Sequence, residues 1–197
     1  INRLIKRTFD IIFSLIIILF IMSWLVPLIG VLIKLESKGP IFFTQKRSGL
    51  DNKEFKCYKF RSMIVNEKSD TQQASKNDSR MTILGRFLRR SSIDEMPQFF
   101  NVFIGDMSVV GPRPHMLKHT VDYSKIIDGY MLRHLVMPGI TGAAQVNGFR
   151  GETKTKEDME NRVKYDVWYL ENWTLFLDIK LIFLTVLNLI KGSENAV

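Results

Sequence analysis

The sequence is poor in the residues that build redox and transition-metal sites: it has one cysteine and three histidines among 197 residues. The single Cys57 excludes an internal disulfide and fits a reducing compartment, and we expect it to be a small buried side chain. His115 and His119 are four residues apart, but no third zinc ligand accompanies them, which favours packing or helix-capping roles. Three common signatures, G-x-x-x-x-G-K-[ST], H-E-x-x-H and paired C-x-x-C, are also missing.

Negative charge is scarce in the first half of the chain. Residues 1–97 carry 17 basic and 9 acidic side chains, whereas residues 98–197 carry 11 of each. A basic half indicates an anionic partner, such as membrane headgroups, nucleic acid or a phosphorylated ligand. Because many of these cations flank an apolar segment, membrane lipid explains them better, and we expect no nucleic-acid partner.

That apolar segment, residues 11–33, contains no charge over 23 positions. A straight helix of this length measures about 35 Å and can cross a bilayer core of about 30 Å. Pro27 lacks an N–H and crowds the Ser23 carbonyl, so a bend is expected near these residues, where the Ser23 hydroxyl is a candidate partner for freed backbone groups. Basic residues on both flanks indicate the same, cytoplasmic side. We therefore favour a helix that enters one leaflet, bends and returns, with a single crossing as the alternative.

The rest of the sequence predicts a small β element and amphipathic helices. Strands are expected at residues 41–45 and 54–61. A short amphipathic helix is expected within residues 81–92, ending at the serines, and two more helices at 157–173 and 173–191. The last helix is mostly apolar, but its charged residues Asp178 and Lys180 disfavour a membrane span and favour an interfacial or packed helix. The predicted class is α+β and mostly helical, with residues 1–38 as the re-entrant helix with its basic flanks and 39–197 as a domain that forms one unit with it.

The segment "RRSSIDEMPQ" contains two adjacent carboxylates, Asp94 and Glu95. Ser92 and Glu95 match a capping box. Pro97 is not compatible with a helix capped by Ser92, because proline has no N–H to donate at a position where the helix needs one. If the helix begins at Pro97 instead, both carboxylates precede its positive end, where a metal or phosphate can approach. Spacing alone leaves both interpretations open.

Several cations complement this acidic pair. Lys59 and Arg61 alternate on a predicted strand, Arg89 precedes the carboxylates, and Arg113 is held between two prolines. Each alone would be read as a solvated surface residue, but together with a Mg²⁺-binding acidic pair they resemble the parts needed for phosphoryl transfer. The alternative from another class is a non-enzymatic, membrane-anchored module that recruits a partner through its basic face.

Five segments, in this order, resemble the bacterial sugar transferase family, the monotopic phosphoglycosyl transferases. They are "FFTQKRSGL", "YKFRSM", "IDEMPQFFNVFIGDMSVVGPRP", "PGITGAAQVNG" and "YDVWYLENWTLFLDIKLI". The resemblance covers nearly the whole chain and is greatest to the catalytic portion of undecaprenyl-phosphate glucose phosphotransferases, whose "RGET" segment matches residues 150–153. It implies a monotopic membrane domain with interfacial helices and a catalytic part on the cytosolic face.

The resemblance also implies a reaction and roles for residues. A UDP-sugar, with glucose favoured, gives its sugar-1-phosphate to undecaprenyl phosphate and releases UMP, at the cytoplasmic face of the bacterial inner membrane. Asp94 would be the nucleophile that forms a covalent phosphosugar, and Glu95 would help to hold Mg²⁺. The remaining implied contacts are Lys59 as a catalytic residue and Arg89, Arg113, Arg150 and Asp166 as substrate-binding residues.

The sequence differs from the family pattern at two points. Many members bend the re-entrant helix at a Ser-Pro pair, whereas here Ser23 is followed by Trp24 and the proline comes at position 27. An inserted Phe149 shifts Arg150 by one position relative to the family. The sequence leaves open whether the chain forms a homodimer.

Overall fold

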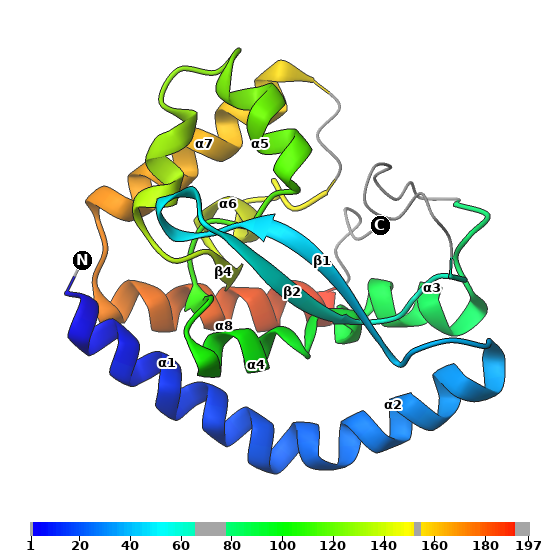
Figure 1. The fold of residues 1–197 in the computed structure, drawn as a ribbon. Helices are drawn as coiled ribbons and strands as arrows, with labels where there is room; N and C mark the ends of the chain where they lie inside the picture. The colour runs from blue at the N-terminus through cyan, green and yellow to red at the C-terminus, as the bar shows by residue number, and fades with distance from the viewer. Residues whose placement is uncertain (1, 66–77, 152–154, 192–197) are drawn as a thin grey trace.

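The computed structural model of the chain describes residues 2–65, 78–151 and 155–191, and helices dominate it (Figure 1). The α-helices are α1 (Arg3–Ile17), α2 (Ser23–Glu36), α3 (Ile83–Arg90), α4 (Gln98–Ile104), α5 (Leu117–Ser124), α6 (Ala143–Val146), α7 (Lys156–Glu171) and α8 (Leu175–Lys191). Other helical turns are the π-helical η1 (Ile18–Met22) and the 3-10 segments η2 (Leu50–Asn52), η3 (Ile93–Glu95) and η4 (Tyr130–Leu135). Together with two small sheets, they confirm the mostly helical α+β class.

The larger sheet is a hairpin of β1 (Phe42–Ser48) and β2 (Glu54–Phe60), which pair antiparallel from Phe42 opposite Phe60 to Ser48 opposite Glu54. The predicted strands are confirmed, but β1 continues three residues further than expected. The tight turn is possible because Asp51 and Asn52 adopt positive φ angles, which these residue types tolerate better than most. A second, parallel pair joins β3 (Ser108–Val110) to β4 (Gly139–Thr141).

The N-terminal helix bends without breaking. In Figure 1, α1 and α2 form two arms that meet at the lowest point of the molecule, with the concave side toward the rest of the chain. At the bend, the Ser23 N–H donates to the Ile18 carbonyl, five residues back, which is the π-helical pattern that commonly marks a kink. The expected bend is present, but it lies in η1, just before the Ser23–Pro27 stretch. From Arg3 to Glu36 the helix is long and apolar enough, by length and composition, to cross a membrane.

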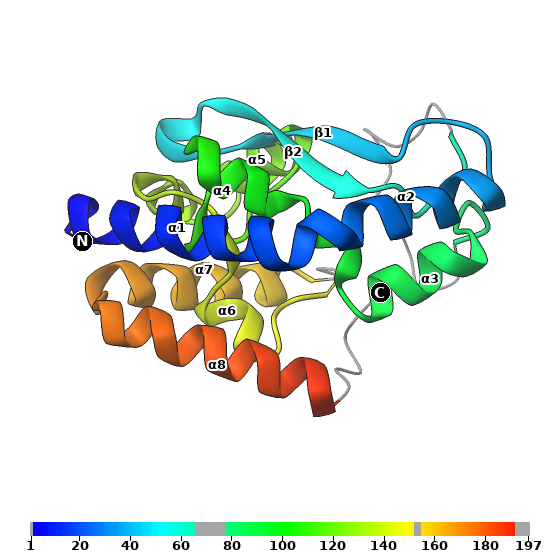
Figure 2. The ribbon, with the colours of Figure 1, turned by 90° about the horizontal axis from the view of Figure 1, so that it is seen from below.

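The bent helix packs along one end of the molecule. Figures 1 and 2 show α4 and α8 beside α1, and α3 beside α2, whereas α5 and α7 lie at the opposite end. A core of apolar side chains from α1, α4, β3 and α8 fills the first contact, and another from α2, β2 and α3 fills the second. Both arms therefore contact the same body.

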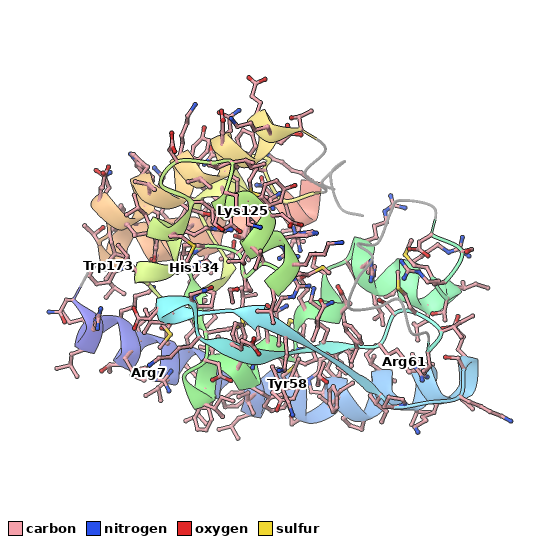
Figure 3. All side chains as sticks on the ribbon, turned by 45° about the horizontal axis from the view of Figure 1, so that its top comes forward. Arg7, Tyr58, Arg61, Lys125, His134 and Trp173 are labelled. Atoms are coloured by element: carbon pink, nitrogen blue, oxygen red, sulfur yellow. The ribbon has the colours of Figure 1, made fainter. Side chains whose placement is uncertain are left out.

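Buried charges attach α1 to the rest of this body. Lys6 donates to Asp178 at 2.8 Å and to the Tyr169 hydroxyl at 3.0 Å, and Trp173, labelled in Figure 3, donates to the same carboxylate. Arg7, also labelled there, donates to two carbonyls near the end of α4. These bonds fix α1 in position and in rotation.

Helix α8 buries a stripe of polar side chains beside its core-packed Leu181, and it exposes large apolar side chains on its outer side. Asp178 is fully buried, Thr185 contacts Thr141 at 2.6 Å, and Asn188 donates to the Val146 carbonyl at 3.0 Å. Large apolar side chains face outward from α8 and from its neighbours at this end of the molecule. They include Phe176, Ile179, Phe183, Val186 and Ile190 of α8, Leu15, Leu19, Phe20 and Trp24 of the bent helix, and Ile83 and Phe87 of α3. An exposed apolar surface of this extent indicates a binding surface.

Candidate active site

Asp94 and Glu95 lie on the 3-10 turn η3, ahead of helix α4. Ser92 has a left-handed backbone conformation, and its hydroxyl accepts a bond from Arg150 at 2.7 Å. Helix α4 begins at Gln98, directly after Pro97. The capping-box interpretation is therefore wrong, and the helix starts beyond both carboxylates because proline fits the entry to a helix and not its interior.

Glu95 is the point on which the cations converge. Its Oε1 lies 2.6 Å from Lys59 Nζ and 2.6 Å from Arg113 Nη2, and its Oε2 lies 3.1 Å from Arg113 Nη1 and 3.5 Å from Arg150 Nη2. Burial alone would raise the pKa of this carboxyl, but the charges of Arg113 and Lys59 outweigh burial and hold the pKa well below its usual range. Glu95 is therefore ionised and neutralised by its neighbours.

Asp94 has the opposite environment. It is 6% exposed, and within the described ranges no hydrogen bond or ion pair engages its carboxylate. Burial raises its pKa to about 6, with Lys59 and Arg89 opposing the shift and Glu95 adding to it. At neutral pH this carboxylate is mostly ionised, poorly solvated and unpaired, which are properties of a reactive oxygen nucleophile.

Lys59 reaches the pair because β2 is fastened to α4. Buried Asn101 of α4 accepts from the Tyr58 N–H at 2.9 Å and donates to the Lys56 carbonyl at 2.7 Å. The strand backbone is thus held against the helix that follows the dyad. Arg61 is different: it donates to the carbonyls of Ser37 and Lys38 after α2, at the end of the molecule where Figure 3 labels it. Of these two cations of the predicted strand, only Lys59 contacts the dyad.

Arginines from three separate segments complete the site. Arg89 of α3 donates to Ser62 at 2.8 Å and is close enough to lower the pKa of Asp94. Arg113 and Arg150 come from loops and both reach Glu95. The structure thus brings together six of the residues predicted from sequence: Lys59, Arg89, Asp94, Glu95, Arg113 and Arg150. With both carboxylates ionised, four cations leave a net charge of about +2, which complements a diphosphate.

Asp166 is not part of this group. It is buried in α7 and lies 2.7 Å from Arg133 Nη2, which also donates to the Arg113 carbonyl. His115 packs against the same arginine and contacts the Tyr130 hydroxyl at 2.7 Å. Burial and the neighbouring arginines hold the pKa of His115 well below its usual range, so its ring is neutral.

Sequence reasoning missed two members of this buried layer, Arg133 and Arg162. A usable signal was present for Arg162, since it lies four residues before Asp166 and therefore on the same face of a helix. Arg133 lies in a short 3-10 segment without regular periodicity, so no sequence pattern predicts that it is buried.

The two adjacent carboxylates can hold Mg²⁺ only when a substrate is bound beside them. No cluster of three or more His, Cys, Asp or Glu side chains suited to a metal occurs in the part of the chain that the structure describes. Mg²⁺ commonly binds one or two carboxylates and takes its other ligands from phosphate oxygens and water. Both oxygens of Glu95 already contact Lys59, Arg113 or Arg150. Mg²⁺ can therefore bind Glu95 only when a substrate phosphate takes over these cationic side chains.

Comparison with known proteins agrees with this arrangement. The sequence model described as bacterial sugar transferase matches residues 1–192. UDP-glucose:undecaprenyl-phosphate glucose-1-phosphate transferases of Klebsiella pneumoniae and Escherichia coli are 54% and 52% identical to the chain, each over 99% of it and 41% of their own length. A UDP-N-acetylgalactosamine-undecaprenyl-phosphate N-acetylgalactosaminephosphotransferase of Aeromonas hydrophila is 42% identical over 95% of the chain and 44% of its own length. The chain spans about two fifths of these relatives, and it belongs to the bacterial sugar transferase family.

Proposed function

We propose that this chain is the catalytic portion of an undecaprenyl-phosphate sugar phosphotransferase that uses a UDP-sugar as donor. The observation that carries the proposal is the contrast within the dyad. Asp94 is buried and has no ion-pair partner among the described residues, whereas Glu95 beside it contacts Lys59, Arg113 and Arg150. Glucose is the favoured sugar, because relatives named for glucose are more similar to the chain than the one named for N-acetylgalactosamine.

The reaction proceeds in two displacements. A carboxylate oxygen of Asp94 attacks the phosphorus that bears the sugar, the bond to the bridging oxygen breaks, and UMP leaves with the electron pair. An oxygen of undecaprenyl phosphate then attacks the same phosphorus and releases the Asp94 carboxylate, which yields the lipid diphosphate sugar. A carboxylate and a diphosphate repel each other, so the cations around Glu95 must first neutralise the donor.

The cations around Glu95 neutralise the donor diphosphate in different ways. Lys59 contacts Glu95 and its charge also acts on Asp94, so it can move from Glu95 to a donor phosphate while it still favours the ionised form of Asp94. The planar guanidinium of Arg113 suits two phosphate oxygens at once. When bound with the donor, Mg²⁺ would be held by Glu95 and would supply further positive charge to the phosphates.

Attachment to one membrane leaflet is also part of the proposal. Both arms of the bent helix contact the same body, through the Lys6–Asp178 pair at one end and through Arg61 and Ser37 at the other. A helix that crossed a bilayer would carry these two ends to opposite sides of the membrane. The outward apolar faces of α8 and α3 support an orientation with this end in the lipid, and the basic flanks support the cytoplasmic face of the inner membrane.

The test is donor turnover by the purified protein in lipid nanodiscs. A panel of UDP-sugars with undecaprenyl phosphate and Mg²⁺ should release UMP fastest with UDP-glucose. Isotope exchange between UMP and the donor, with acceptor absent, should occur in the wild type and be lost in Asp94→Asn. Turnover without exchange would replace the covalent route with a direct transfer, and lipid binding without any turnover would favour a recruitment module.

A further inference from the structure

A second buried cluster of charge lies behind the site, where η4 packs on α7. It contains two guanidinium groups, Arg133 and Arg162, and one carboxylate, Asp166, and each side chain belongs to a residue that is at most 6% exposed. Arg133 Nη2 lies 2.7 Å from Asp166 Oδ2, and Arg162 lies one helical turn before Asp166. The two displacements described above use none of these three groups.

Each buried arginine holds the backbone of a loop that carries an arginine of the site. Arg133 Nη2 donates to the carbonyl of Arg113 itself, at 2.9 Å. Arg162 Nη2 donates, also at 2.9 Å, to the carbonyl of Gly151, the residue that follows Arg150. The two loops are far apart in sequence, yet the same pair of elements fixes both.

The charges of the cluster make these bonds strong and rigid. Hydrogen bonds from an ionised donor are roughly twice as strong as neutral ones, and buried side chains lose little further freedom when they form them. Burial, followed by repulsion from Arg133 and Arg113, lowers the pKa of Arg162 to about 10, which leaves it charged at neutral pH. Asp166 is near both guanidinium groups and offsets part of their mutual repulsion.

We propose that Arg133, Arg162 and Asp166 are positioning residues, which hold the loops of Arg113 and Arg150 so that both guanidinium groups converge where the donor diphosphate binds. This inference rests on the proposed function. It also assigns Asp166 a place behind the site, in contact with Arg133, and not a contact with substrate. Misplacing a phosphate clamp by about 1 Å can cost on the order of 100-fold in rate, so the cluster has a measurable share in catalysis.

The test compares Arg133→Met and Arg162→Met, which keep much of the volume but lose the donors. For each, kcat/KM for the donor in the exchange reaction should fall by about 10- to 100-fold. UDP, used as a binding probe, should bind correspondingly more weakly. Arg162→Lys should recover part of the loss, since an ammonium keeps the charge and can donate to the Gly151 carbonyl. If Arg162→Met does not fold, kcat/KM and UDP binding are measured on Arg162→Lys instead.

The matched control is Asp178→Asn, which removes one partner of another buried ion pair, with Lys6, at the other end of the molecule. It should lower the melting temperature as much as the Met variants do, yet keep kcat/KM per folded molecule within about 2-fold. Met variants that behaved in the same way would reduce the cluster to a structural role and overturn the inference.

A double-mutant cycle identifies the residue through which Arg133 acts. If it acts through Arg113, Arg133→Met should cost less than about 2-fold in kcat/KM when Arg113 is already alanine. Full additivity of the two losses would contradict this. A wild-type protein without turnover would refute the proposed function itself, whereas normal Met variants beside an active wild type refute only the positioning role.

Discussion

Replacing Lys59 with methionine should move the pH dependence of the first displacement in a direction that the structure fixes. Lys59 is the strongest of the charges that lower the pKa of Asp94, and burial nevertheless raises that pKa to about 6. Methionine keeps a chain of similar length without the charge. The pKa of Asp94 should therefore rise above 6 in Lys59→Met, because burial and Glu95 then act against fewer cations.

The size of the effect follows from the fraction of Asp94 that is ionised. With a pKa of about 6, roughly 90% of the groups are ionised at pH 7. Loss of one close opposite charge moves a pKa by about 1 to 3 units, and a rise of about 2 units would leave about 10% ionised. The exchange rate at pH 7 should then fall by about 10-fold from this cause alone, and this part of the loss should return by about pH 9.

The assay is UMP–donor isotope exchange without acceptor, measured from pH 5 to 9. The wild-type rate should fall about tenfold per unit below pH 6, and the acid limb of Lys59→Met should lie at higher pH. Lys59→Arg, which retains a charge at this position, should keep its limb near that of the wild type. An acid limb that stays near pH 6 in Lys59→Met would refute the assignment of Lys59 as the charge that keeps Asp94 ionised, whatever the overall loss of rate.

Three further results are expected. Glu95→Gln should weaken the Mg²⁺ dependence of exchange and raise the donor KM, because Arg113 loses the carboxylate that aligns it; an unchanged Mg²⁺ titration would count against the metal role. Asp178→Asn should lower the free energy of unfolding by about 3 to 5 kcal/mol, since the buried ammonium of Lys6 loses the carboxylate that it contacts, and chemical denaturation checks this. Phe183→Glu, at a side chain that is 62% exposed, should weaken the binding of the protein to vesicles without changing the fold, which a vesicle flotation assay measures. If the variant floats with the vesicles as completely as the wild type does, α8 does not face the lipid.

Local chemistry was strong enough to predict several features from the sequence. Pro27 predicts a bend because it cannot donate an N–H, and the bend lies within one turn of the expected place, in η1. Pro97 predicts a helix start beyond the dyad for the same reason, and α4 begins at Gln98. A short run rich in aromatic and basic residues predicts β2 and places Lys59 on it.

Long-range contacts were beyond such reasoning. Lys6 and Asp178 are 172 residues apart, and each alone is typical of a surface position. Lys59 and Arg61 alternate on the predicted strand, but β2 ends at Phe60. Arg61 donates to backbone carbonyls after α2, whereas Lys59 contacts Glu95. The sequence places Thr174, Asp178, Thr185 and Asn188 on one stripe of the last helix. The inward direction of the stripe depends on Thr141 and on the Val146 carbonyl, which belong to other segments.

The same burial that raises the pKa of Asp94 should also lower the free energy of unfolding at neutral pH. The pKa of Asp94 is 3.8 in the ordinary case and about 6 here, so its ionised form destabilises the folded state by roughly 3 kcal/mol at pH 7. Because the folded pKa is the higher one, this cost is complete above about pH 6 and vanishes below about pH 4, where both states are protonated. Asp94→Asn should accordingly lose all exchange yet unfold at a higher denaturant concentration than the wild type at pH 7, with the gap closing toward pH 4. A variant less stable than the wild type at pH 7 would show that Asp94 is held by partners that stabilise its charge, and would remove the physical reason for its role as nucleophile.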